Sequence, residues 1–250
     1  MNATPPTYDL SLLERSAAKW QASPALRTVY GDIFGAMRQA LAPGRVLEIG
    51  SGIGVAREYF PGLVASDVMV TPYVDRAISA YAIPLESWGN IIALDVLHHL
   101  QEPLRFLESA ATGLAVGGRL ILAEPAGTVG GRLFYRLFHR EPCRPAEVLS
   151  PFRFATDADG EFANMGMAHA LFGGEQPEVD ACLRACGLRL VSVRYRDLLA
   201  YPATGGFSWP ALLPAPVLRG LLAVERGLPQ ALLRFLALRM IVVLEKNHPT

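Results

Sequence analysis

The run of residues 45–54, Arg-Val-Leu-Glu-Ile-Gly-Ser-Gly-Ile-Gly, constrains the fold of this chain more than any other stretch. The apolar residues on both sides of Glu48 favour a strand that is covered on both faces, as in a parallel sheet. Gly50, Gly52 and Gly54 then allow a tight turn and a close approach of the backbone to a ligand, because glycine has no Cβ. Open α/β sheets bind ligands at the carboxyl ends of their strands, so we expect a ligand at this turn.

Length and charge narrow the class of protein. A chain of 250 residues suits one α/β domain with an elaboration. Its 23 basic and 23 acidic residues balance, and no basic or aromatic-basic stripe is present, which argues against a nucleic-acid partner. Three cysteines are too few for a secreted disulfide framework, and the sequence shows neither a signal peptide nor an apolar run of membrane-spanning length. We therefore expect a cytoplasmic location.

Apolar periodicity and turn residues predict alternating strands and helices along most of the chain. Two helices are expected first, at residues 11–20 and 24–41, the second with Ser23 as its N-cap and Pro24 at its first position. Further strands are expected at residues 63–67, 73–78, 90–96, 119–124, 188–195 and 238–245, and helical segments at 55–60, 102–115, 129–139 and 178–186. This alternation predicts right-handed crossovers and a mostly parallel sheet.

We expect a single domain over residues 1–250. Its parts are an N-terminal helical cover (1–42), a sheet core (43–196 and 238–246) and an insertion rich in proline and leucine (197–237). Leucines with intervening arginines in residues 207–237 favour amphipathic helices. This stretch is expected to pack on the core, to form a lid over a substrate, or to make a dimer or peripheral membrane contact.

Four blocks occur in a characteristic order: residues 47–54, Asp67, residues 95–100 and residues 117–120. Together they resemble the class I S-adenosylmethionine-dependent methyltransferases, in the small-molecule, type 11-like branch, over residues 46–125. The resemblance implies a doubly wound, Rossmann-like sheet of seven strands, mostly parallel, with the last strand antiparallel between the fifth and sixth. It also implies methyl transfer from S-adenosyl-L-methionine to a small-molecule acceptor, at oxygen or carbon. The apolar insertion suggests an apolar or lipid-like metabolite.

The resemblance also implies the contacts of the cofactor. Backbone amides of the glycine turn would hold its carboxylate, Glu48 would orient its amino-acid end, and Asp67 would accept two hydrogen bonds from the ribose. Ser79 stands where the family commonly has an acid that binds the adenine amino group, and Asp75 lies too early for that position. The expected cofactor-binding residues are Glu48, Gly50, Ser51, Gly52, Gly54, Asp67, Ser79, Ala80 and Asp95.

A hydroxyl acceptor would need a base to remove its proton. His99 and His98 are the nearest catalytic candidates, because they follow the fourth strand and a histidine pKa lies near neutrality. Residues 134–142 mix aromatic, histidine, arginine and glutamate side chains and could contact an acceptor or pack as a surface helix. No cluster of histidines, cysteines or acids has metal-ligand spacing along the chain, so we expect no metal.

Two other functions compete with this interpretation. A nicotinamide-dependent oxidoreductase also uses glycines after its first strand, but the G-x-G-x-x-G spacing would need glycine at position 55, which is Val55. A non-catalytic, methyltransferase-like partner protein is the other alternative. Its motivation is Ser79 in place of an acid, while the intact glycine turn and Asp67 argue against it.

Overall fold

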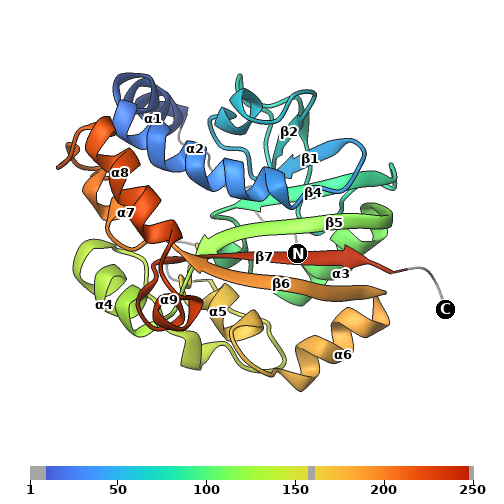
Figure 1. Cartoon of the computed structure of the whole chain (residues 1–250). Helices are drawn as coiled ribbons and strands as arrows, with labels where there is room; N and C mark the ends of the chain where they lie inside the picture. The colour runs from blue at the N-terminus through green and yellow to red at the C-terminus, as the bar shows by residue number, and fades with distance from the viewer. Residues whose placement is uncertain (1–9, 157–160, 248–250) are drawn as a thin grey trace.

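The computed structural model describes residues 10–156 and 161–247, and its strands form one seven-stranded sheet (Figure 1). The spatial order is β3-β2-β1-β4-β5-β7-β6, and β7 is antiparallel to both β5 and β6. The strands are β1 (Val46–Ile49), β2 (Val64–Asp67), β3 (Arg76–Ala77), β4 (Trp88–Leu94), β5 (Leu114–Pro125), β6 (Leu188–Arg196) and β7 (Arg239–Lys246). This order confirms the predicted doubly wound sheet and the position of its antiparallel strand.

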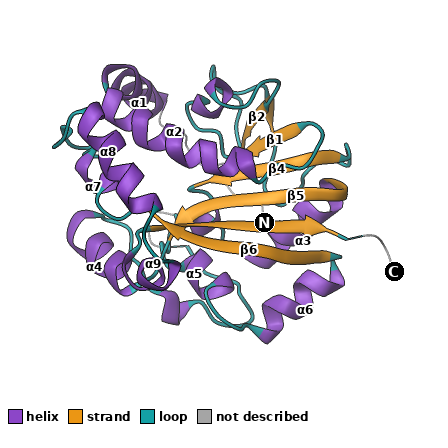
Figure 2. Ribbon diagram, in the orientation of Figure 1, coloured by secondary structure: helices purple, strands orange, loops and turns teal. Residues whose placement is uncertain are grey.

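Helices cover both faces of the sheet (Figure 2). The α-helices are α1 (Leu10–Ala22), α2 (Pro24–Gln39), α3 (Pro103–Gly113), α4 (Val129–Phe138), α5 (Met167–Phe172), α6 (Pro177–Ala185), α7 (Ala200–Ala203), α8 (Ala215–Arg226) and α9 (Gln230–Leu236). Short 3₁₀ helices are η1 (Val55–Glu58), η2 (Leu97–His99) and η3 (Pro145–Glu147). As predicted, Ser23 caps α2, because its hydroxyl accepts a hydrogen bond from the Leu26 amide.

Alternate residues of each central strand enter different hydrophobic cores. In β4, Ile91 and Ala93 pack in the core that contains α3, α5 and α6, whereas Ile92 packs with α2 and α8. In β5, Leu122 packs in the first of these cores and Ile121 in the second. Strand side chains alternate between the two faces, so continuous apolar runs are needed where both faces are covered. This double burial explains the apolar strands of the sequence.

The structure corrects two predicted segments near the glycine turn. The third strand spans Arg76–Ala77 instead of residues 73–78, because a turn closed by Thr71 occupies Tyr73 and Val74. The segment predicted at residues 55–60 is the 3₁₀ helix η1, and it spans only Val55–Glu58. No α-helix of the described residues therefore lies between β1 and β4, and the chain passes from strand to strand through short turns.

The insertion partly packs on the core. Leu218 and Leu222 of α8 are buried in the same cluster as residues of α2, and the two helices lie side by side in Figure 1. Of the helices in the described part of the chain, none combines the length and the apolar character that crossing a bilayer requires.

Arg239, the first residue of β7, joins three parts of the chain. Its side chain is buried, and it donates to both oxygens of Asp95, which follows β4, at 2.8 and 2.7 Å. The guanidinium carbon lies 4.5 Å from the centroid of the Tyr201 ring and 5.5 Å from that of Tyr30. Such bidentate and ring contacts exploit the planar guanidinium. The ion pair thus links the carboxyl end of β4 to β7, and the ring contacts of Arg239 link both to α2 and α7.

We expect Arg239→Met to lower the free energy of unfolding by about 3–5 kcal/mol, because it leaves Asp95 without its counter-charge in a largely buried site. Urea denaturation measures the change. The matched control is Arg194→Met, which removes an exposed arginine of β6 and should change stability by less than about 0.5 kcal/mol. Equal effects of the two substitutions would contradict this stabilising role of Arg239.

Candidate active site

The glycine turn has a backbone that other residues would strain. Gly50, Gly52 and Gly54 have φ angles of 69°, 52° and 68°, in the left-handed region. A Cβ on Gly50 would lie 2.5 Å from the Val96 side chain, whereas one on Gly52 would have no neighbouring atom within 4 Å. The turn is therefore packed from behind and leaves open space in front of Gly52.

Asp67 and the glycine turn are held together at the carboxyl edge of the sheet. The buried Asp67 side chain accepts a hydrogen bond from the Gly52 amide at 2.9 Å. Ser51 fixes the other side of the turn, because its hydroxyl accepts from the Ser66 amide at 3.0 Å and its own amide donates to the Ser66 carbonyl. The structure thus brings together Asp67 and the turn residues expected to bind the cofactor.

Glu48 lies beneath this turn, and its carboxyl group makes few hydrogen bonds with the described residues. Its side chain is buried, and its Oε2 atom has no hydrogen-bond partner among the described residues. Burial raises the pKa of Glu48 to about 7, although a hydrogen bond from Ser51 opposes the rise; the negative charge of Asp67 adds to it. A buried carboxylate without a partner is costly unless a donor or cation satisfies it.

Ser79 and Ala80 follow the short strand β3, and Ser79 is half-buried. The Ser79 hydroxyl accepts from the Tyr81 amide at 3.2 Å. Asp75 points elsewhere, since its carboxylate accepts from the Ala65 amide at 2.9 Å and pairs with Arg57 at 2.8 Å. The adenine contacts of Ser79 and Ala80 stay predictions.

Asp95 pairs with an arginine at the end of β4. Its two carboxylate oxygens are engaged by Arg239, as described above, and its backbone is in the left-handed region at φ 57°. The predicted contact of Asp95 with the cofactor stays a prediction.

His98 is held between two carboxylates. Its Nδ1 atom lies 2.8 Å from Glu124 Oε2, and its Nε2 atom lies 3.6 Å from Glu141 Oε2. Burial alone lowers the pKa of His98, but Glu124 and Glu141 outweigh it and raise the pKa to about 10. Both ring nitrogens of His98 therefore face carboxyl groups. The role of His98 as a base stays a prediction.

His99 has a different environment. Its side chain is exposed, and its Nδ1 atom lies 3.3 Å from the Phe162 carbonyl oxygen. Surrounding protein lowers the pKa of His99, and the neighbouring charge on His98 lowers it further. A neutral, accessible imidazole suits a base better than His98 does.

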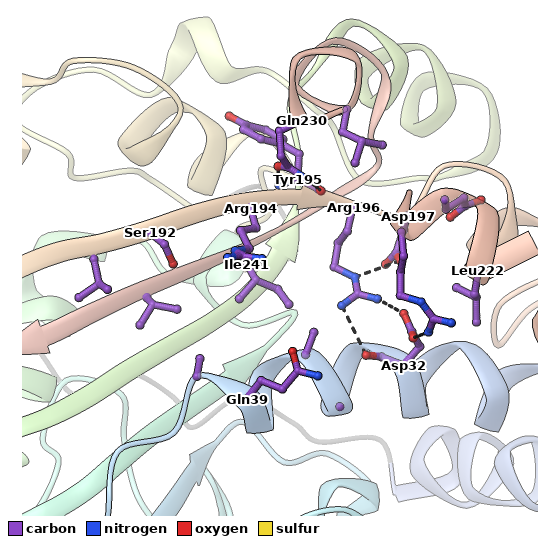
Figure 3. Close-up of a pocket in the computed structure, with 18 of the residues that line it drawn as sticks. Asp32, Gln39, Ser192, Arg194, Tyr195, Arg196, Asp197, Leu222, Gln230 and Ile241 are labelled. Carbon is purple, nitrogen blue, oxygen red and sulfur yellow. Dashed lines mark hydrogen bonds and ion pairs between the residues drawn. The ribbon is translucent and has the colours of Figure 1, made fainter. Parts of the chain in front are cut away.

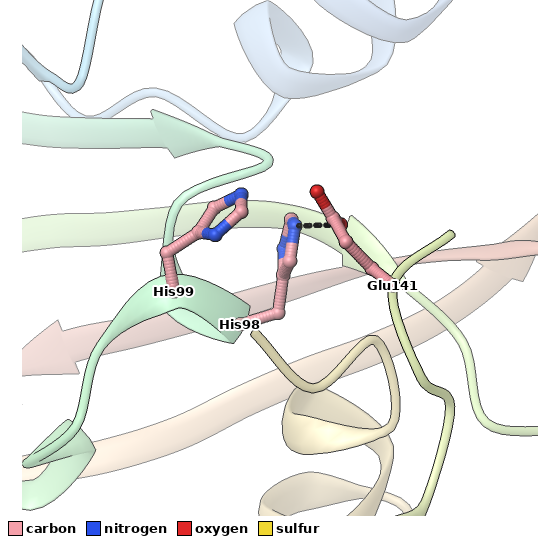
Figure 4. Close-up of side chains that lie close together, drawn as sticks. All are labelled: His98, His99 and Glu141. Carbon is pink, nitrogen blue, oxygen red and sulfur yellow. Dashed lines mark ion pairs between the residues drawn. The ribbon is translucent and has the colours of Figure 1, made fainter. Parts of the chain in front are cut away.

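Figure 4 shows a group of side chains that the spacing of the sequence did not reveal: His98, His99 and Glu141. One ligand atom from each lies within 4.8 Å of the other two. Glu141 is remote from the histidines along the chain, but the segment after α4 returns to the end of β4. The mixed composition of residues 134–142 was the available signal for this residue.

A cavity of about 630 Å³ lies elsewhere, between α2 and the strands β6 and β7 (Figure 3). Asp32 accepts hydrogen bonds from both Arg196 and Arg226 at its rim, so these charges compensate one another. None of the predicted cofactor-binding residues lines it.

The pKa of Glu48 predicts a pH-dependent stability. The folded chain retains a proton on Glu48 up to about pH 7, whereas the usual value of 4.5 applies when the chain is unfolded. The unfolded state thus binds fewer protons between these values, so this group makes the free energy of unfolding fall as pH rises through that window. Glu48→Gln should remove this dependence and be more stable than wild type by about 1–3 kcal/mol at pH 8.

Urea denaturation of both proteins at pH 5 and pH 8 measures this difference. Glu108→Gln, which changes an exposed carboxylate of α3, is the control and should follow the wild-type pH profile. Identical profiles for Glu48→Gln and wild type would show that Glu48 has an ordinary pKa.

No protein-family model and no curated protein matches the chain. Solved structures do match its fold. The structure of a complex between the Haloferax volcanii Trm112 methyltransferase activator and a methyltransferase aligns with a TM-score of 0.53 at 14% identity, over 99% of this chain and 99% of the matched chain. An S-adenosylmethionine-dependent methyltransferase from Mesorhizobium loti gives a TM-score of 0.47 at 12% identity, over 86% and 96% of the two chains.

A further match is the 1,6-didemethyltoxoflavin-N1-methyltransferase of Burkholderia thailandensis, with bound 1,6-didemethyltoxoflavin and S-adenosylhomocysteine. Its TM-score is 0.44 at 16% identity, over 99% of this chain and 92% of that chain. The sheet order and the Haloferax likeness agree on the architecture. The chain therefore has the fold of the class I S-adenosylmethionine-dependent methyltransferases.

Proposed function

We propose that this protein transfers a methyl group from S-adenosyl-L-methionine to a small-molecule acceptor, at oxygen or carbon. The observation that carries the proposal is the buried Oε2 atom of Glu48, below an open glycine turn, which has no hydrogen-bond partner within the described part of the chain. The cofactor has an ammonium and a carboxylate at one end, and these groups match Glu48 and the turn amides, respectively.

Each part of the site has a separate task in this proposal. When bound, the cofactor supplies an electrophilic methyl group. The turn amides and Glu48 hold its amino-acid end, and Asp67, which is tied to the Gly52 amide at 2.9 Å, binds the ribose hydroxyls. His99 lies after β4 at the same edge of the sheet and is the predicted base for a hydroxyl acceptor. Alignment of the acceptor contributes most of the catalysis.

The fold supports this function over an oxidoreductase. The dinucleotide-binding fold has the parallel order 3-2-1-4-5-6, whereas here the antiparallel β7 separates β5 from β6. The glycine turn also lacks the third glycine of the dinucleotide fingerprint at Val55.

We expect Asp67→Asn to weaken the binding of S-adenosylhomocysteine about 10- to 100-fold, because hydrogen bonds to a charged group contribute about 1.5–3 kcal/mol. Isothermal titration calorimetry measures the dissociation constant. The control, Asp75→Asn, alters the acid that pairs with Arg57 and should leave this affinity within about threefold of wild type.

Thermal-shift titration of the wild-type chain provides a direct test of the cofactor. Stabilisation by S-adenosylmethionine but not by NAD supports the proposal. Stabilisation by NAD alone would favour an oxidoreductase, and no response to either would favour a non-catalytic partner protein.

We also propose that residues 207–237 form a contact with a lipid surface or with a second copy of the chain. Trp209 and Leu212 support it, because their side chains are 68% and 77% exposed. We expect the double variant Trp209→Ser/Leu212→Ser to lose co-sedimentation with liposomes or, for a dimer, to sediment as a monomer. A wild-type chain that neither binds liposomes nor dimerises would contradict the contact.

A further inference from the structure

The orientation of His98 is set by a buried acid at the end of β5. Glu124 is fully buried, and its Oε1 atom accepts from the Val96 and Leu97 amides, both at 2.8 Å. Its Oε2 atom lies 2.8 Å from His98 Nδ1. With Nδ1–H of His98 donating to Glu124, the Nε2 atom of the ring faces Glu141. This carboxylate–histidine arrangement is the usual support of a metal-binding imidazole.

The spacing between His98 and Glu141 suits a shared ion better than a direct hydrogen bond. Their Nε2 and Oε2 atoms are 3.6 Å apart, which is beyond the normal range for an N–H···O bond. Two ligand atoms that each lie about 2.0–2.2 Å from one tetrahedral ion are roughly 3.4 Å apart. His99 completes the group within 4.8 Å. The exposed His99 and half-exposed Glu141 side chains can close the remaining distance by small rotations.

One loop holds the backbone near all three residues. The Asn164 amide donates to the His98 carbonyl, and the Met165 amide donates to the Pro142 carbonyl, next to Glu141, both at 2.8 Å. The Phe162 carbonyl oxygen lies 3.3 Å from Nδ1 of His99. If that nitrogen carries the proton, Nε2 of His99 is left as a donor atom for an ion. These contacts hold the backbone segments that carry the three side chains close together before any ion binds.

We propose that His98, His99 and Glu141 form a binding site for a divalent transition-metal ion of the Zn²⁺ type. Two imidazoles and one carboxylate are the ligand set of many zinc sites that keep an open position. Because His99 and Glu141 are accessible, the remaining coordination positions would take water or an oxygen donor of a substrate (Figure 4). This site does not depend on methyl transfer. The same nitrogen of His99 cannot bind a metal ion and accept a proton from a methyl acceptor at the same time, because both use its lone pair.

Binding of Zn²⁺ and Co²⁺ to the untagged, full-length chain tests the proposal in the absence of any cofactor. We expect one ion per chain by calorimetry, a Zn²⁺-dependent rise in melting temperature, and visible Co²⁺ absorption typical of four or five ligands. Glu141→Gln and His99→Gln should each weaken Zn²⁺ binding about 100-fold or more, since even supporting residues of metal sites contribute 10- to 100-fold.

Glu147→Gln is the matched control, because it changes an exposed carboxylate on the same segment and should bind Zn²⁺ as wild type does. Wild-type chain that binds no Zn²⁺, or Zn²⁺ binding that both ligand variants retain, would overturn the proposal. Binding at Cys182 and Cys186 would also overturn it, and a near-ultraviolet sulfur-to-cobalt charge-transfer band would reveal that binding. A wild-type chain that binds Zn²⁺ but not S-adenosylhomocysteine would refute the proposed function but not the metal site.

Discussion

The arrangement of residues at the carboxyl edge of the sheet depends on the hydrogen bonds of the buried Glu124 side chain. Its two oxygens together bind two backbone amides and one imidazole, and all three groups belong to the segment that follows β4. This segment includes Val96, whose side chain packs behind Gly50. One acid at the end of β5 therefore holds both the wall of the glycine turn and the histidine pair. A buried charge with three hydrogen-bond partners can be stable where an unpaired one cannot.

The two halves of this edge have opposite electrostatic character. At the glycine turn, Glu48 has a buried oxygen with no partner among the residues that the structure describes, and burial raises the pKa of Glu48 to about 7. After β4, His98 lies between Glu124 and Glu141, and its pKa rises to about 10 despite burial. Burial governs the pKa in the first environment, whereas the two neighbouring carboxyl groups govern it in the second.

Local patterns predicted most elements because their physical causes are local. Apolar strand patterns and the Ser23 cap act within a few residues, and β1, β4, α2, α4 and α6 form near their expected positions. The predicted third strand was too long, because a turn closed by Thr71 replaces extended backbone at the start of that segment. The ion pair between Asp95 and Arg239 was not predicted, since the two residues are remote in sequence and meet only through the β5–β7 pairing.

The sequence alone determined the strand–turn unit around Gly50, the acid at the end of the next strand, and the alternation that leads to a mostly parallel sheet. Backbone conformational preference and apolar periodicity are properties of short segments, so they can be inferred without a fold. Only the tertiary structure decided which charges meet. In the fold, Asp95 pairs with Arg239, and His98 lies between two glutamates. One oxygen of Glu48 has no partner among the residues described in the structure. Burial and ion pairing depend on distances between segments far apart in the chain, and those distances exist only after the sheet has formed.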